Sequence, residues 1–300
     1  MVDMGTFLCY YDKALSNYKS NRVLCQEEID MKKNLALLLA ATMVAGCFMT
    51  GCGSATKETK ADAADNGERT TLTVGFDASF PPYGYQENGE YVGFDLDLAQ
   101  EVCERNGWEL IKTPIDWDAK DMELNSGAID CIWNGFTING REDAYTWSDP
   151  YVNNTQVFAV KKGGAVTSAA DLAGKVVLVQ ADSSALAALK DESNADLTAT
   201  FGQLIEVKDY ESALLELEAG SADAVAMDEG VAVAKQAKNE NITILEDVIS
   251  TEQYGIGFKL GNEELRDQVW ATLLEMEADG TVDTIAEKYS MNKDNICIGE

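Results

Sequence analysis

The chain has 300 residues, with 52 acidic against 23 basic side chains and a formal net charge of −29 at pH 7. Hydrophobic residues make up 46% of it, enough to build packed cores, which excludes an intrinsically disordered chain. The acidic balance argues against nucleic acid or an anionic membrane surface as a broad partner, because both are themselves negative. There is no histidine, which excludes Ser-His-Asp hydrolysis, imidazole acid–base chemistry and the commonest zinc ligand.

Residues 31–52 have the pattern of a lipoprotein signal peptide. Met31-Lys32-Lys33 places two cations before a short leucine- and alanine-rich run, which is too short for a transmembrane anchor. The run ends in a sequence that resembles a bacterial lipobox, so Cys52 is predicted to become the lipid-modified N-terminus, with Cys47 as the competing site. Residues 1–30 do not belong in front of a signal peptide, and we predict that translation starts at Met31.

Residues 53–69 are small, polar and charged without an apolar period, and they are predicted to form a flexible tether. From residue 70 onward, strand-like and helix-like segments alternate, which is typical of a parallel sheet flanked by helices. The first half predicts strands over 71–76, 108–111, 131–133 and 157–160, a helix over 96–103 ended by Gly107, and a short helix from Trp117 ended by Gly127.

A second α/β unit begins at about residue 160. It predicts strands over 176–179, 205–207 and 224–228, helices beginning at Ala185 and Ser212, and then a returning strand over 254–258 followed by two amphipathic helices. If this ending packs on the first unit, the chain crosses between two lobes twice, which creates a hinge and a cleft. We therefore predict an α/β fold with lobe 1 over 70–158 and 253–292 and lobe 2 over 159–252.

The stretch from Asp130 to Tyr151 joins a buried strand to a polar loop. Gly135 allows close approach of the backbone to a ligand, and Arg141 carries a fork of donors suited to a carboxylate. These residues indicate a site for a small anion. An ordinary strand-to-helix turn with a surface arginine explains the same pattern.

The seven cysteines show no Cys-x-x-Cys spacing. Four of them lie in or before the targeting region. Cys103 and Cys131 could pair, but free buried thiols are expected.

Several ordered motifs between Leu72 and Tyr289 resemble those of the family 3 extracellular solute-binding proteins, the amino-acid receptors of ABC importers. The matching segments are VGFDASFPPYGY, GFDLDLAQEV, the GFTI, Arg141 and WSDPY run, DLAGKVVLVQADSS, and AGSADAVAMDE with YGIGFK. The resemblance implies a type 2 periplasmic-binding-protein-like fold with two crossover strands as hinge, no catalysis and no cofactor. The implied partners are a free amino acid, permease subunits and, through the lipid anchor, the membrane; a monomer is expected.

The resemblance also implies roles at matching positions. Arg141 is expected to pair with the ligand α-carboxylate, helped by backbone N–H groups of the Ser183–Ser184 turn at a helix N-terminus. The ligand α-ammonium is expected to meet three groups, namely the Gly135 carbonyl, the Thr137 hydroxyl and the Asp228 carboxylate. The arginine fork and the helix dipole would bind the anionic end of the ligand, and the carboxylate and the neutral acceptors would bind its cationic end. Together these groups complete a site for a zwitterion.

Four further positions match those that determine ligand preference. Phe80 and Trp117 match rings that flank the ligand side chain, and Asp77 and Asn134 match positions that read its polar end. A core role for Phe80 and a loop-capping role for Asp77 explain the same residues. These side chains favour a polar or cationic amino acid as the ligand.

Three departures from the family pattern bear on the site. The loop from Thr137 to Arg141 is one residue shorter than usual, and Phe80 stands where tyrosine is common. Asp182 stands where glycine is frequent, and it is expected to lie beside the carboxylate site, cap the following helix or read a cationic ligand.

The leading prediction is a receptor held on the extracellular face of the cytoplasmic membrane. An enzyme on the same fold, similar to cyclohexadienyl or arogenate dehydratases, is the alternative, since fold does not fix function. A ligand-sensing domain is a third class.

Overall fold

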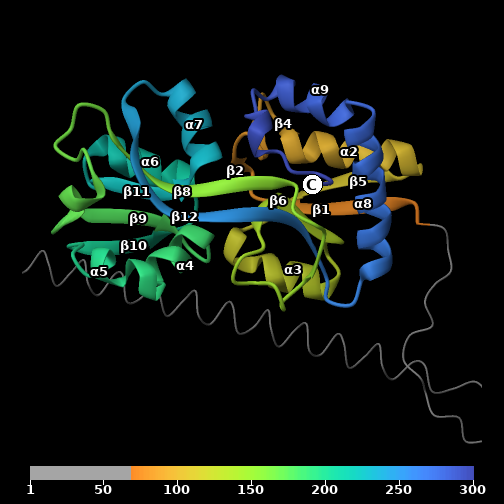
Figure 1. The fold of residues 1–300 in the computed structure, drawn as a ribbon, viewed down its shortest axis with the longest axis horizontal. Coiled ribbons are helices and arrows are strands. Elements are labelled where there is room, and N and C mark those ends of the chain that lie inside the picture. Colours follow the sequence, from red (N-terminus) through yellow and green to blue (C-terminus); the bar gives the residue numbers. More distant parts are fainter. Residues whose placement is uncertain (1–68) are drawn as a thin grey trace, which may run out of the picture. The chain divides into compact units, whose positions relative to one another are not determined.

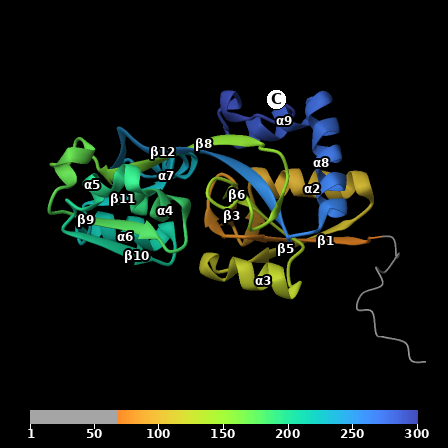
Figure 2. The same cartoon turned by 60° about the horizontal axis from the view of Figure 1, so that its bottom comes forward.

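The computed structural model describes residues 69–300, so the predicted signal peptide, lipidation site and tether segment to residue 68 lie outside the described residues. These residues form two α/β lobes joined by two long strands (Figures 1 and 2). One sheet of nine strands runs through both lobes in the order β10-β9-β11-β8-β12-β6-β1-β5, and β7 pairs with β12. The predicted two-lobed α/β fold is confirmed.

Lobe 1 is the lobe built on the parallel strands β6, β1 and β5. Helix α2 lies on one face of these strands and α3 on the other, while α8 and α9 pack beside α2 (Figure 1). Its elements are β1 (Thr71–Phe76), β2 (Ser79–Phe80), β3 (Gly84–Glu87), β4 (Glu90–Val92), α2 (Phe94–Asn106), β5 (Glu109–Pro114), α3 (Lys120–Ser126), β6 (Cys131–Thr137), β7 (Thr146–Trp147), α8 (Glu263–Ala278) and α9 (Thr281–Lys288).

Lobe 2 is the lobe built on β9, β10 and β11, which are also parallel. Helices α4 and α5 lie on one side of these strands and α6 and α7 on the other (Figure 1). Its elements are β9 (Val176–Gln180), α4 (Ser184–Lys190), α5 (Ala195–Thr198), β10 (Gln203–Val207), α6 (Tyr210–Ala219), β11 (Ala224–Asp228) and α7 (Glu229–Lys238). Helix α7, which is rich in alanine and valine, was not among the predicted helices.

The two strands that connect the lobes are β8 (Val152–Lys161) and β12 (Ile242–Phe258), which pair with each other antiparallel. Both begin earlier than the predicted strands at 157 and 254. Asn154, Gln156 and Glu252 account for the part of the difference that lies next to each predicted strand, because these polar side chains are buried. Polar residues broke the apolar pattern from which strands are predicted, although the backbone there is extended.

Glycines end three helices, and those after α2 and α3 were predicted. Gly107, Gly127 and Gly220 follow α2, α3 and α6 with φ between 72° and 80°, a left-handed conformation that favours glycine. Each glycine N–H bonds to a carbonyl of the last helical turn.

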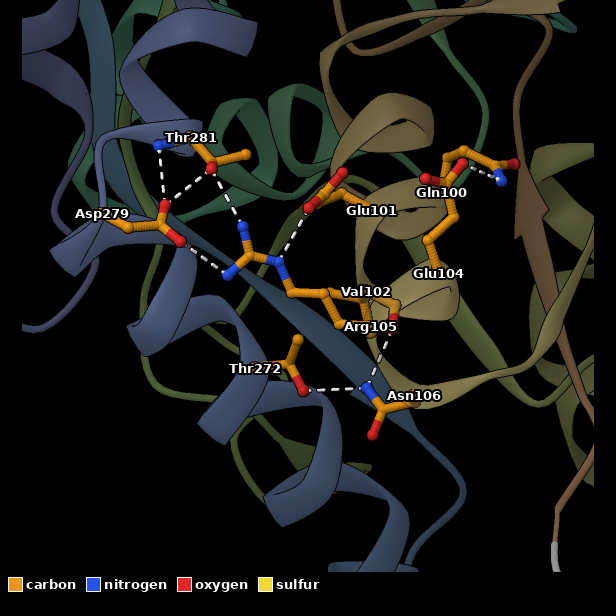
Figure 3. A network of polar contacts seen from close by, with 9 residues as sticks. All are labelled: Gln100, Glu101, Val102, Glu104, Arg105, Asn106, Thr272, Asp279 and Thr281. Atoms are coloured by element: carbon orange, nitrogen blue, oxygen red, sulfur yellow. Dashed lines mark hydrogen bonds and ion pairs between the residues drawn. The ribbon is translucent and has the colours of Figure 1, made fainter.

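A polar network fixes α2 against the segment that joins α8 to α9 (Figure 3). Arg105 binds Glu101 on its own helix at 2.7 Å, and its other nitrogens bind Asp279 at 2.8 Å and Thr281 at 2.9 Å. The next residue, Asn106, donates to Thr272 of α8. The C-terminal helices are thereby fastened to the first helix of lobe 1.

The three cysteines among residues 69–300, Cys103, Cys131 and Cys297, are free thiols and are buried. The expectation of free thiols is confirmed for Cys103 and Cys131. Within the same residues, no helix combines the length and the apolar character that a membrane span requires.

Candidate ligand-binding site

A small cavity of about 10 Å³ lies between the lobes, room for roughly one water molecule. It is lined by Phe80, Trp117, Gly135, Thr137, Arg141, Gln180, Ser183, Ser184 and Asp228. Eight of the ten predicted site residues line this cavity, and Gln180 is an addition. The lobes are therefore closed over the predicted site. A larger groove of about 470 Å³, lined in part by Tyr83, Gly230 and Met291, contains none of the predicted residues.

Arg141 reaches across the cavity from lobe 1 to lobe 2. Its Nη1 donates to the Thr137 carbonyl at 3.3 Å, and its Nη2 donates to the Asp182 carbonyl at 3.0 Å. The guanidinium carbon lies 5.3 Å from the centre of the Phe136 ring, which supports it from one side. The short loop after Thr137 thus still brings the guanidinium to the cavity.

Asp182 does not cap the helix, contrary to one of the roles expected for it. The cap of α4 is Ser183, whose hydroxyl accepts from the Leu186 N–H at 3.2 Å. Asp182 instead forms an ion pair with Lys120 of lobe 1, whose ammonium is almost completely buried. Its φ of 57° explains why a glycine suits this position.

The Ser183–Ser184 turn is shaped partly by its own hydrogen bonds. The Ser183 N–H donates to the Gln180 carbonyl at 3.3 Å, and the Ser183 hydroxyl donates to the same carbonyl. The predicted contribution of a Ser183 N–H to an anion thus requires this turn bond to weaken. The Ser184 hydroxyl points the other way, toward Gln156 and Glu252.

Asp228 is buried at the carboxyl end of β11 and accepts four hydrogen bonds. The donors are Asn154 at 3.0 Å, Gln156 at 2.6 Å, Tyr210 at 2.8 Å and Tyr254 at 2.6 Å. Burial raises the pKa of the Asp228 carboxyl, and the hydrogen bonds from Tyr254, Tyr210 and Gln156 lower it in part. All four donors are neutral groups, so the carboxylate is hydrogen-bonded but not charge-compensated by them.

Strand register brings this cluster together. Asp228 of β11 pairs with Gln156 of β8, and Asn154 of β8 pairs with Glu252 of β12. Neighbours across strands lie on one face of the sheet, so residues far apart in sequence meet beneath the cavity. Glu252 was not among the predicted site residues. The sequence signal was the alternation of polar residues at Asn154 and Gln156. This alternation points to Glu252 only once the strand register is known.

Glu252 connects lobe 1, lobe 2 and the connecting strands through one oxygen. Its Oε1 accepts from Thr137 at 2.9 Å, Asn154 at 2.8 Å, Gln156 at 2.7 Å and Ser184 at 3.3 Å. Burial, together with the adjacent Asp228 carboxylate, raises the pKa of Glu252 to about 7.

Aromatic rings close the cavity on the lobe 1 side. Phe80 stacks on Tyr210 of lobe 2 with ring centres 5.9 Å apart, and Trp117 packs edge-on against Phe136 at 5.4 Å. The Lys120 ammonium lies 5.5 Å from the Trp117 ring centre. Phe80 is both buried core and cavity wall, and its flanking of a ligand side chain stays a prediction.

Asp77 and Asn134 lie behind the cavity and do not line it. The Asn134 side-chain oxygen accepts from the Asp77 N–H at 2.8 Å, and the Asp77 carboxylate accepts from Ser79 and from Gln180 of lobe 2. Burial raises the pKa of the Asp77 carboxyl. A direct contact of either side chain with a ligand remains a prediction.

Gly135 is positioned by a buried carboxyl group. Its φ is 55°, and its N–H donates to Asp95 at 2.7 Å, as does the Tyr151 hydroxyl. The other Asp95 oxygen has no hydrogen-bond partner among the described residues. Burial raises the pKa of Asp95 to about 7.

We predict that the free energy of unfolding falls as the pH rises from 5 to 8. Between the unfolded pKa of about 4 and the folded pKa of about 7, the native state binds a proton at Asp95 that the unfolded state does not. Denaturant titrations at four pH values should show a shallower dependence for Asp95→Asn than for wild type. The exposed Asp143→Asn variant is the control, and an unchanged slope in Asp95→Asn would contradict the assignment.

Comparison with known proteins agrees with this architecture. Residues 72–292 match the model of the bacterial extracellular solute-binding proteins, family 3. The L-cystine-binding protein TcyJ of Escherichia coli (strain K12) is 30% identical over 230 residues, covering 74% of this chain and 83% of that protein. The arginine-binding extracellular protein ArtP of Bacillus subtilis is 28% identical over 264 residues, covering 86% and 98%.

Solved structures give the same result. An ancestral arginine-binding protein bound to arginine is 38% identical, with a TM-score of 0.67 over 74% of this chain and 99% of that one. A substrate-binding protein of an ABC uptake transporter from Streptococcus pneumoniae, with bound histidine, is 30% identical, with a TM-score of 0.69 over 73% and 92%. The sheet order, the two connecting strands and the sequence match place the chain among these proteins: it belongs to family 3 of the bacterial extracellular solute-binding proteins.

Proposed function

We propose that the chain is the substrate-binding component of an ABC importer and captures a free amino acid between its lobes. One observation carries this proposal: Arg141 and Asp228 line the same cavity from different lobes. A guanidinium for the α-carboxylate and a carboxylate for the α-ammonium are the partners that a zwitterion requires. A ligand that touches both lobes stabilises the closed state over the open one, and this differential contact drives closure.

The cavity must widen to admit an amino acid, and the contacts between the lobes must break for this to happen. Arg141 exchanges the Asp182 carbonyl for the ligand carboxylate, which has the planar geometry that its fork prefers. The Ser183–Ser184 turn adds N–H donors to that end. At the other end, the Gly135 carbonyl, the Thr137 hydroxyl and Asp228 accept from the ammonium.

A polar amino acid fits the walls best. Phe80 and Trp117 flank the side chain, while Gln180 and the nearby Asp77 and Asn134 supply polar groups at its far end. Relatives are named for binding cystine, arginine and histidine. We propose the same range of polar or cationic side chains here.

The remaining parts of the chain complete the receptor. We propose that a lipid on Cys52 holds the protein on the extracellular face of the cytoplasmic membrane, that the protein is a monomer, and that it delivers its ligand to permease subunits. Residues 70–158 and 253–292 then move as lobe 1 and residues 159–252 as lobe 2.

Calorimetry tests the proposal directly. The protein beginning at residue 53 should be titrated with each of the twenty amino acids and with cystine, and we expect one polar or cationic amino acid to bind at one site per chain. Chromatography of the mixture should recover that amino acid unchanged. Absence of binding to every amino acid would defeat the proposal.

A further inference from the structure

Two carboxylates, Asp228 and Glu252, share their hydrogen-bond donors. Gln156 Nε2 lies 2.6 Å from Asp228 Oδ1 and 2.7 Å from Glu252 Oε1. Asn154 Nδ2 lies 3.0 Å and 2.8 Å from the same two oxygens. Because two nitrogens each contact both oxygens, the carboxylates are immediate neighbours.

The pair is buried without a cation among its hydrogen-bond partners in residues 69–300. Asp228 is 3% exposed and Glu252 is 7% exposed. Their donors are the hydroxyls and amides of Thr137, Asn154, Gln156, Ser184, Tyr210 and Tyr254. Two adjacent buried carboxylates can both be ionised only if a positive charge accompanies them. Without that charge, the pair keeps a proton.

The cluster also has more acceptors than donors. The Gln156 Oε1 atom is buried beside both carboxylates and has no hydrogen-bond donor among the described residues. An ammonium group brings three donors and one positive charge. It would therefore supply both the positive charge and the hydrogen-bond donors that this cluster lacks.

We infer that Glu252 is a second acceptor for the ligand α-ammonium, and that Asp228 and Glu252 hold one proton between them until that ammonium replaces it. The ligand cation enters next to Thr137 and Ser184, both of which line the cavity and bond to Glu252. The displaced proton leaves to solvent. This inference rests on the proposed function and adds to it a proton exchange at the ammonium end of the site.

The neighbouring phenols do not supply a competing proton near neutral pH, whereas Asp95, which binds the Gly135 N–H, has its own pKa raised to about 7. Burial raises the pKa of each neighbouring phenol well above 10; these are Tyr83 after β2, Tyr210 on α6 and Tyr254 on β12. Asp77 faces Tyr210 from lobe 1, and Arg141 lines the same cavity. With the pKa of Glu252 at about 7, the pair titrates as a unit near neutral pH.

The shared proton sets the direction in which ligand affinity changes with pH. Below about pH 7 the free receptor carries the shared proton, and binding must expel it, so affinity weakens as the pH falls. One proton with a pKa near 7 makes binding about tenfold weaker at pH 6 than at pH 8.

Calorimetry in two buffers measures the proton directly. L-Arginine and L-glutamine are suitable probes, because neither side chain titrates between pH 6 and 8. With the tighter-binding of the two, titrations at pH 7 in phosphate and in Tris should differ in enthalpy by the ionisation heat of about half a proton released, because a group with a pKa of about 7 is half protonated at that pH. Equal enthalpies in the two buffers would overturn the inference.

The Glu252→Gln variant keeps the shape and one acceptor oxygen of the side chain but cannot share a proton. We expect its proton release to fall to near zero, its affinity at pH 8 to weaken by about tenfold, and its affinity to change little between pH 6 and 8. Glu246→Gln, an exposed residue on the same strand, should behave as wild type. A Glu252→Gln variant with wild-type proton release would show that Glu252 only supports the fold.

A readout without ligand separates this inference from the proposed function. Infrared spectra at pH 6, recorded in an Asp95→Asn background so that Asp95 contributes no acid signal, should contain a protonated carboxylic acid band that is lost in Glu252→Gln and retained in Glu246→Gln. If no amino acid binds, the proposed function fails. If an amino acid binds but neither the band nor the proton release depends on Glu252, the inference alone fails.

Discussion

Replacing Arg141 with alanine is expected to weaken amino-acid binding by about 30-fold to several thousand-fold. Loss of one partner of a buried, hydrogen-bonded charge pair costs about 2–5 kcal/mol, and each 1.4 kcal/mol is a factor of ten. The ligand carboxylate would be left against the Ser183–Ser184 turn, whose Ser183 N–H already bonds to the Gln180 carbonyl. Calorimetry with the amino acid identified for wild type measures the loss.

The fold should tolerate this change. Arg141 is half-exposed, and its bonds to the Thr137 and Asp182 carbonyls join exposed or partly buried groups. We expect a melting temperature within a few degrees of wild type. Arg141→Lys keeps the charge but loses the fork, so its affinity should lie between those of wild type and alanine variants. Near-wild-type affinity in Arg141→Ala would place the carboxylate elsewhere.

A methyl group added at Gly230 is expected to oppose lobe closure. Gly230 lies in α7 of lobe 2, and a Cβ there would lie 2.6 Å from the Tyr83 hydroxyl oxygen of lobe 1 and 3.1 Å from its ring. Tyr83 is buried and packs edge-on against Tyr254, so it has little room to move. Overpacking of this kind costs about 1–3 kcal/mol. Because the contact joins two lobes, the cost falls on the closed state.

Gly230→Ala should therefore bind about 5- to 150-fold more weakly than wild type. X-ray scattering should show a larger radius of gyration at the same ligand concentration. Tyr83→Phe removes the oxygen that the new methyl meets, so the double variant should recover much of the affinity. Failure of Tyr83→Phe to restore binding would show that the methyl acts within lobe 2 and not across the cleft.

Residues at the carboxyl ends of strands were easier to single out from the sequence than polar residues inside the two connecting strands. Arg141 and Ser183 follow strands and Asp228 ends one, and all three were singled out by residue type and motif; their roles toward a ligand stay predictions. Gly107 and Gly127 marked helix ends because only a left-handed residue fits there.

Residues of the connecting strands were missed for a physical reason. Asn154, Gln156 and Glu252 are polar and buried, and a polar residue in a strand is ordinarily expected on the solvent side. Their burial depends on β8 lying between β11 and β12, which is a long-range pairing. Likewise, the ion pair of Lys120 with Asp182 joins lobes that only the closed fold brings together.

The buried thiols make this receptor well suited to site-directed labelling. Burial raises the pKa of Cys103 to about 12 and that of Cys131 well above 9, so neither forms a reactive thiolate at neutral pH. The protein beginning at residue 53 also omits the four N-terminal cysteines. Cysteines introduced at the exposed positions Met122 of α3 and Leu215 of α6 would accept dyes on opposite lobes. Opening and closing of single molecules could then be followed without replacing Cys103, Cys131 or Cys297, all of which are buried.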